Sequence, residues 1–119
     1  MKNLFDNYTS AFNHLDSTAI ADNYVIPCAI NDSDGKQVYT SYEYLKEKFT
    51  VNMESLKTLG YQSAKYKIIK TMPMGEGATA VDISWRVYTT ASNIEFKCLY
   101  ICHLTDLGWK IFSANVYLD

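Results

Sequence analysis

The hydrophobic pattern of the chain changes period after residue 62, and this change constrains the fold more than any other feature. Four segments are rich in β-branched and aromatic residues at a spacing of two: SAKYKIIKTM, TAVDISWRVY, EFKCLYICHL and WKIFSANVYL. The turn-forming sequences PMGEG, TTASN and TDLG separate them. A period of two places successive side chains on opposite faces of a sheet. The pattern therefore predicts four antiparallel strands joined as a meander.

The first part of the chain has the spacing of helices instead. Apolar residues recur at steps of three and four across residues 4–15, which predicts one helix with a single apolar face. Asp16 or Ser17 is placed to cap a second, shorter helix, in which Ile20 and Tyr24 lie one turn apart. A proline follows soon afterwards and ends this helix.

Residues 40–60 predict a third and longer helix. Thr40 and Glu43 stand at the spacing of a capping box, and Gly60 stands where a helix ends. Its apolar stripe consists of Leu45, Phe49, Met53 and Leu56. The charged residues of the other face are predicted to form a solvated surface. These are Glu43, Lys46, Glu47, Lys48, Glu54 and Lys57.

A short hairpin is predicted between the second and third helices. The segments CAI and QVYT flank NDSDGK, a cluster of turn formers that includes a glycine. The same cluster fails as a calcium loop, because Ile30 and Ser41 stand where acidic ligands are required. The predicted order ααββαββββ describes an α+β fold, with three helices packed on a curved antiparallel sheet. The 119 residues are expected to form one domain, 1–119.

Charge and motif content exclude several classes of function. The net charge is −2 and the eleven basic residues are scattered, so the sequence does not predict a nucleic-acid partner. No apolar run approaches the roughly 20 residues of a membrane span, and no signal peptide is recognisable. Three cysteines cannot all pair, which suits a reducing, cytoplasmic location. No metal-ligand spacing and no phosphate or dinucleotide motif occurs, so neither metal nor cofactor is predicted.

The third long strand looks apolar on both faces. Leu99 and Ile101 alternate with an apolar row on the opposite side of the strand. A sheet backed by helices on one side should alternate more cleanly between apolar and polar residues. One interpretation is that a second copy of the protein covers this face, which makes the protein a homodimer. The other is that both residues are ordinary, partly exposed strand residues.

Aromatic residues are abundant: ten tyrosines, five phenylalanines and two tryptophans. A strongly curved sheet around a long helix leaves a conical space, and aromatic rings with polar tips suit its walls. The candidate pocket residues are Phe12, Tyr24, Phe49, Met53, Trp85, Tyr100 and Trp109. Each of them taken singly is equally compatible with an ordinary core position.

Several motifs together resemble a known superfamily. They are NYTSAFNHLDSTAIADNYV, the DSDG turn and the closing DLGWKIFSANVYLD, and they occur in the order of elements given above. The chain resembles the nuclear-transport-factor-2-like superfamily, whose cystatin-like cone also houses ketosteroid isomerases and polyketide cyclases. The resemblance covers nearly the whole chain. It implies the fold, while the same fold serves catalysts, binding modules and dimerisation domains.

The resemblance to ketosteroid isomerases also implies two catalytic positions. Tyr8 falls on the hydroxyl donor of the first helix, and Asp32 falls on the carboxylate base at the end of the first short strand. The third member of that pattern is a protonated acid, and here Tyr100 or Cys102 stands near its place. In such a site the carboxylate removes a proton next to a carbonyl, and the tyrosine stabilises the enolate. Alternatively, Asp32 caps its turn and Tyr8 is a core residue.

Three functions remain open at this point. The first is a homodimeric domain that binds a small, largely apolar organic molecule in an aromatic-lined pocket. The second is an isomerase or cyclase that uses Asp32 as general base and Tyr8 as hydrogen-bond donor. The third is a non-catalytic dimerisation domain whose cone is filled by its own side chains.

Overall fold

The computed structural model describes residues 1–118 and contains three helices and six strands within them. The helices are α1 (Lys2–Asn13), α2 (Ser17–Ala21) and α3 (Tyr42–Thr58). The strands are β1 (Tyr24–Asp32), β2 (Gly35–Tyr39), β3 (Tyr61–Pro73), β4 (Ala78–Thr89), β5 (Asn93–Thr105) and β6 (Gly108–Tyr117). The predicted α+β class and the order ααββαββββ are confirmed.

All six strands belong to one sheet, in the order β2-β1-β6-β5-β4-β3. The antiparallel meander of β3 to β6 is confirmed. The sheet as a whole is mixed rather than antiparallel, because β1 runs parallel to β6. This pairing joins segments from opposite ends of the chain. The alternation of apolar and polar residues within a strand does not indicate which distant strand it pairs with.

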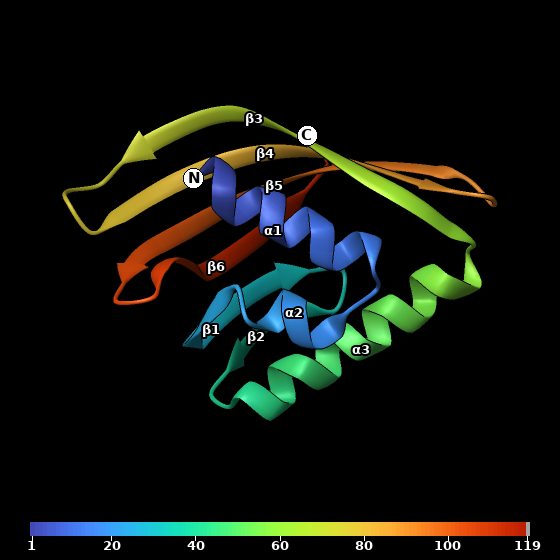
Figure 1. Cartoon of the computed structure of the whole chain (residues 1–119), viewed down its shortest axis with the longest axis horizontal. Helices are drawn as coiled ribbons and strands as arrows, with labels where there is room; N and C mark the ends of the chain where they lie inside the picture. The colour runs from blue at the N-terminus through green and yellow to red at the C-terminus, as the bar shows by residue number, and fades with distance from the viewer. Residues whose placement is uncertain (119) are drawn as a thin grey trace.

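The long strands arch over the helices, and α1 crosses the concave face of the sheet (Figure 1). The two shorter strands and α2 lie beneath, next to α3. The inner face is a hydrophobic core to which both layers contribute. Its largest fully buried side chains include Phe5, Ile20, Leu45, Ile83 and Ile111. Burial of these side chains, each worth roughly 1.5–3 kcal/mol, holds the helices to the sheet.

Two helix starts test the predicted caps. Asp16 caps α2, since its carboxylate accepts a hydrogen bond from the backbone N–H of Ala19 at 3.1 Å. The cap of α3 is Ser41 and not Thr40, because Ser41 has the extended backbone of a cap and its hydroxyl accepts from the N–H of Tyr44. Neighbouring hydroxyls can both serve this role, and sequence spacing alone does not choose between them.

The predicted second helix ends earlier than its apolar spacing suggests. Tyr24 is the first residue of β1 and not part of α2. The hairpin that follows is tighter than predicted, since Asp32 pairs directly with Gly35. Only Ser33 and Asp34 form the turn, and Gly35 takes a positive φ of 103° beside it. This geometry brings three polar side chains to one end of β1: Asp32, Ser33 and Asp34.

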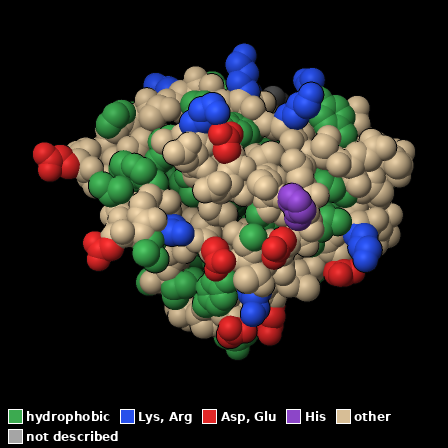
Figure 2. Space-filling model, viewed as in Figure 1, with side chains coloured by type: hydrophobic (Ala, Val, Ile, Leu, Met, Phe, Trp, Pro, Cys, Tyr) green, Lys and Arg blue, Asp and Glu red, His purple; other side chains and the backbone are tan. Residues whose placement is uncertain are grey.

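The surface on the side seen in Figure 2 carries basic side chains along its upper edge, where Figure 1 places β3. Acidic side chains lie mostly lower on the same side, with hydrophobic groups between them. Among residues 1–118, no helix combines the length and the apolar character that a bilayer crossing requires.

The junction between α3 and β3 depends on Gly60. Its φ is 77°, which only glycine adopts without strain. A Cβ atom at this position would also overlap the side chain of Thr90. Rotation of the Thr90 side chain would move its hydroxyl but not its Cβ, which would lie 3.0 Å from the added atom and is held by the hydrogen bond from the Thr90 N–H to the Gly60 carbonyl.

Gly60→Ala is therefore expected to destabilise the fold through both strain and overlap. Gly75→Ala is the matched control, because Gly75 has a φ of 78° but nothing within 4 Å of an added Cβ. We expect the control to cost about 1–2 kcal/mol and Gly60→Ala at least about 1 kcal/mol more, measured by urea denaturation. Equal losses in the two variants would contradict the role given to Thr90.

Candidate functional site

A cavity of about 420 Å³ lies inside the arch of the sheet. It is bordered by α1 and α3 on one side and by strands β3 to β6 on the other, and the β1–β2 turn lies at its rim. This volume falls in the range of small-molecule sites, about 300–1,000 Å³. Much of the wall is aromatic, formed by Tyr8, Phe12, Tyr24, Phe49, Trp85 and Tyr100.

The structure brings together most of the residues predicted for a pocket. Phe12, Tyr24, Phe49, Met53, Trp85 and Tyr100 all line the cavity. Trp109 does not, because the part of β6 that reaches the cavity lies farther along the strand, at Ala114 and Val116. Trp109 instead borders a separate depression beside the start of α1, together with Leu4 and Lys110.

α3 presents two parallel rows of side chains to the cavity. Phe49, Met53 and Leu56 recur at steps of four and three, so they lie on one stripe of the helix and form the apolar row. Lys48, Asn52 and Ser55 have the same spacing one residue earlier and form the polar row. The helix therefore gives the cavity an apolar wall that is bordered by a polar edge.

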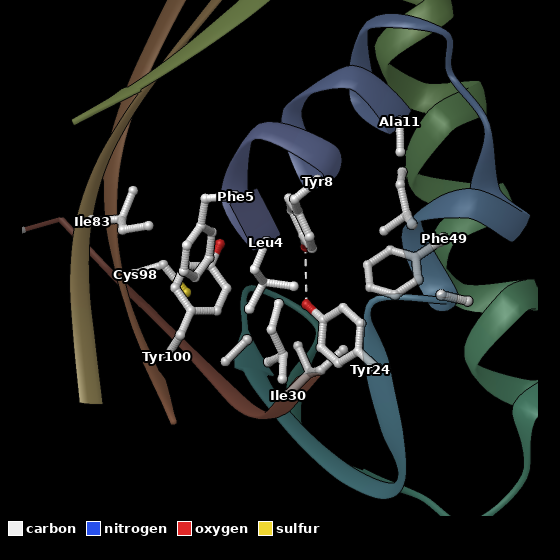
Figure 3. Packing of buried hydrophobic residues seen from close by; sticks show 14 of the residues in the cluster. Leu4, Phe5, Tyr8, Ala11, Tyr24, Ile30, Phe49, Ile83, Cys98 and Tyr100 are labelled. Atoms are coloured by element: carbon white, nitrogen blue, oxygen red, sulfur yellow. Dashed lines mark hydrogen bonds between the residues drawn. The ribbon is translucent and has the colours of Figure 1, made fainter. Parts of the chain in front are cut away.

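Two tyrosines meet inside the cavity. The hydroxyl of Tyr8, from α1, lies 2.9 Å from the hydroxyl of Tyr24 at the start of β1, and both residues are buried. Figure 3 shows the two side chains reaching toward each other from their separate elements. A hydroxyl has one proton to donate. The pair shares one hydrogen bond, so one proton remains, either for Tyr100 beside Tyr8 or for another acceptor.

A cluster of rings closes the space between α1 and the sheet. Phe5 lies 4.9 Å from the ring of Tyr100, and Tyr8 lies 5.8 Å from that of Trp85. Figure 3 shows Phe5 and Tyr100 side by side. The Trp85 indole N–H donates to the Tyr100 hydroxyl at 2.9 Å. This cluster fills one part of the cone with the protein's own side chains, and the cavity occupies the rest.

The buried polar groups of the cavity are held in their neutral, protonated forms. Burial raises the pKa of the Tyr8, Tyr24 and Tyr100 hydroxyls. It also raises the pKa of the Cys98 thiol to about 12. The hydroxyls are thus hydrogen-bond donors at neutral pH, and Cys98 is a thiol rather than a nucleophilic thiolate.

The rim of the cavity carries three charged side chains. The Lys48 ammonium lies 2.9 Å from Asp32 Oδ2 and 3.0 Å from Asp34 Oδ2. Burial alone would lower the pKa of Lys48, but its hydrogen bonds to Asp32 and Asp34 outweigh that effect and raise it. Lys48 is therefore a cation, and it ties α3 to the β1–β2 turn.

Asp32 faces the cavity while its carboxylate is engaged elsewhere. Its Oδ1 accepts the backbone N–H of Asp34 at 3.0 Å, and its Oδ2 pairs with Lys48. The turn-capping interpretation of Asp32 is thus part of its role, and the ion pair is the other part. A carboxylate in this state is suited to accept hydrogen bonds at the rim. It is less suited to take a proton from carbon, because an ammonium and an amide already occupy it.

The third position of the ketosteroid isomerase pattern holds no carboxylic acid. Tyr100 lines the cavity beside Tyr8, whereas Cys102 is buried and does not line it. Cys98, four residues before Cys102 on the same face of β5, reaches the cavity instead. Tyr8 and Asp32 both line the cavity, as the resemblance implies.

Lys48 is the cavity-lining residue that the sequence pattern assigned to the wrong environment. It was expected on a solvated face of α3, but its side chain is only 6% exposed. A usable signal was present: Lys48 begins a polar row next to the apolar row of α3, and the acidic DSD turn needs a counter-charge. Among residues 1–118, no group of three or more potential ligands is placed to hold a metal ion.

The comparisons with solved structures agree with this architecture. An NTF2-like protein of unknown function from Shewanella oneidensis MR-1 superposes with a TM-score of 0.80 at 15% identity, covering 97% of this chain and 93% of that chain. A domain of unknown function with a cystatin-like fold from Nostoc punctiforme PCC 73102 gives 0.79 at 11% identity, covering 98% and 74%. A ketosteroid isomerase-like protein from Erwinia carotovora atroseptica SCRI1043 gives 0.75 at 15% identity, covering 97% and 90%.

These likenesses show a shared fold, since the identities are too low to transfer an activity. No curated protein matches the chain. The model of the family described as "NTF2-like protein (DUF6841)" matches residues 1–118 in one stretch. The chain therefore belongs to this family of NTF2-like proteins.

Proposed function

We propose that the protein binds a small, largely apolar organic molecule in the cavity under the arched sheet, and that it does so as a homodimer. The observation that carries this proposal is a cavity of about 420 Å³ whose wall is mainly aromatic and aliphatic. Burial of a ligand's apolar surface against such a wall is favourable by roughly 25 cal/mol per Å².

The tyrosine pair supplies the orientation of the ligand. When Tyr8 donates to Tyr24, the proton of the Tyr24 hydroxyl remains to be donated. A carbonyl or hydroxyl oxygen on the ligand would accept that proton. The ligand best suited to the cavity thus combines an apolar body with at least one oxygen acceptor.

The cavity can be closed from α3 without a change in its charge. Leu56→Trp adds an indole to the apolar row, and we expect it to abolish ligand binding. Leu107→Trp makes the same change on an exposed loop and serves as the control. The measurement is the shift in melting temperature with a panel of small carbonyl compounds and steroids, since a ligand that binds only the folded state raises it.

Wild type and Leu107→Trp are expected to respond to the same compounds, and Leu56→Trp to none. If no compound shifts the wild type, the binding function fails and dimerisation remains as the function. If Leu56→Trp responds like the wild type, the ligand binds outside this cavity.

An isomerase or cyclase is the second candidate, and it is favoured by one observation: Tyr8 and Asp32 line the same cavity. It ranks second because Lys48 and a backbone amide engage the Asp32 carboxylate. The third position of the pattern holds Tyr100 or Cys102 instead of an acid, which weakens it further.

The two candidates differ in proton exchange on a bound ketone. We expect 2-tetralone in deuterated buffer to exchange its α-protons no faster with the protein than without it, as followed by NMR. The enzymatic alternative requires faster exchange, which Asp32→Asn should reduce by roughly 10²- to 10⁴-fold. Tyr8→Phe should reduce it as well, so loss of exchange in both variants would establish the second candidate.

The outer face of the sheet supports the homodimer. Because strand side chains alternate, Leu99 and Ile101 point away from the helices, opposite Tyr100. Leu99 and Phe112 are each 37% exposed there. Asp82 lies beside Leu99 on the neighbouring strand β4, and both of its carboxylate oxygens lie 2.7 Å from the Tyr117 hydroxyl, which donates to them. The face thus presents apolar side chains, and the hydrogen bonds to its carboxylate reduce the cost of covering that group in an interface.

Leu99→Glu is expected to weaken the dimer at least tenfold, on the order of 1.4 kcal/mol or more. The new carboxylate would lie beside Asp82, the residue with which Leu99 pairs across the strands. Val38→Glu, on the exposed edge strand β2, is the control. Sedimentation equilibrium measures the dissociation constants. A monomeric wild type, or equal effects of the two substitutions, would contradict the proposed interface.

A further inference from the structure

We infer that the cavity selects molecules whose polar end is a cation, so that its ligand is an apolar amine with the ammonium group at the β1–β2 rim. This inference rests on the proposed binding function and specifies the chemical class of the ligand. It follows from the sign, the accessibility and the surroundings of the charges at the rim.

The sign of the rim is negative. Asp32, Asp34 and Lys48 are the charged side chains that line the cavity within the described part of the chain, and together they carry a net charge of −1. The remaining polar groups of the rim are neutral. The negative charge of the rim would therefore repel an anionic ligand, whereas a cationic ligand would neutralise it.

The accessible part of the rim is also its negative part. The side chain of Lys48 is 6% exposed, and both of its contacts are to the Oδ2 atoms of the two aspartates. Asp34 is 63% exposed, and within residues 1–118 its Oδ1 accepts no hydrogen bond. Asp32 is 17% exposed. A molecule arriving at the rim thus meets carboxylate oxygens, while the ammonium of Lys48 is covered.

The surroundings suit an organic cation as well. Asn52 and Ser55 continue the polar row of α3 from Lys48, and their side-chain oxygens can accept hydrogen bonds from an ammonium. The next row begins with Phe49, whose ring lies 5.3 Å from that of Tyr24. Ring faces attract ammonium groups, most strongly where water is excluded. The apolar body of the same molecule would fill the aromatic part of the cavity.

Three probes with one apolar body and different polar ends test this inference. They are 2-(naphthalen-2-yl)ethylamine, 2-(naphthalen-2-yl)ethanol and 2-naphthaleneacetate, which are cationic, neutral and anionic at pH 7. Isothermal titration calorimetry gives the dissociation constant of each. We expect the amine to bind at least about tenfold more tightly than the alcohol, as for a hydrogen bond to a charged group, and the acetate to bind most weakly.

Two substitutions at the rim should change this order in opposite directions. Asp34→Asn removes one exposed carboxylate while keeping its shape, and should bring the amine to within about threefold of the alcohol. Lys48→Met leaves the two carboxylates without their counter-charge, and should widen the preference for the amine. A variant that fails to fold would bind none of the probes, and melting curves would identify it. Asp34 is exposed, so its substitution carries the test if Lys48→Met does not fold.

The outcomes separate this inference from the function on which it rests. Binding of the alcohol or the acetate as tightly as the amine would overturn the inference and leave the binding function intact. Tighter binding of the acetate would mean that a ligand carboxylate displaces Asp34 from Lys48. No binding of any probe would overturn both. The same amine preference in Asp34→Asn and the wild type would show that the rim does not produce it.

Discussion

The packing of aromatic rings between α1 and the sheet is the interaction on which the site depends. Phe5 rests against Tyr100 at 4.9 Å, and Trp85 lies within 5.8 Å of both Tyr8 and Tyr66. These large side chains set the distance between helix and sheet, because their volume cannot be compressed. α3 follows the β1–β2 hairpin in the chain and lies across the cavity from the long strands. The space that remains beneath the arch, between α3 and the sheet, is the cavity.

The same rings carry polar atoms into the interior, and the fold satisfies them in pairs. Tyr8 meets Tyr24, and Trp85 donates to Tyr100. Among the described residues, no fully buried side-chain nitrogen or oxygen lacks a partner. These polar atoms are therefore compatible with the folded interior, because each has a partner within the protein.

The residue spacing predicted the features that neighbouring residues determine, and it missed those that depend on segments far apart in the chain. The period of two and the apolar stripes predicted the helices and the meander, since burial on one face imposes these spacings. The parallel pairing of β1 with β6 joins distant segments and leaves no local trace. Trp109 has the residue type of a cavity wall but stands too early on β6. Lys48 has the residue type of a solvated surface, yet the acidic turn draws it into the rim. Both errors arose because residue type was judged without its position along the element.

The Lys48 ion pairs also limit what the Asp32 carboxylate can do as a base. The fold brings a tyrosine and an aspartate to one cavity in this chain, and the fold alone does not decide what they do there. A base must be free to accept a proton, whereas the Asp32 carboxylate is held by an ammonium that is itself covered from solvent. Separating the Asp32 carboxylate from the Lys48 ammonium would leave Lys48 buried without its main partner, and an unpaired buried charge is costly. Opening the pair is therefore unfavourable, and the Asp34 carboxylate oxygen that Lys48 does not contact is the one left for an incoming molecule. Recognition of a cation at this point needs no rearrangement of the rim, while proton abstraction by Asp32 needs the pair to open first.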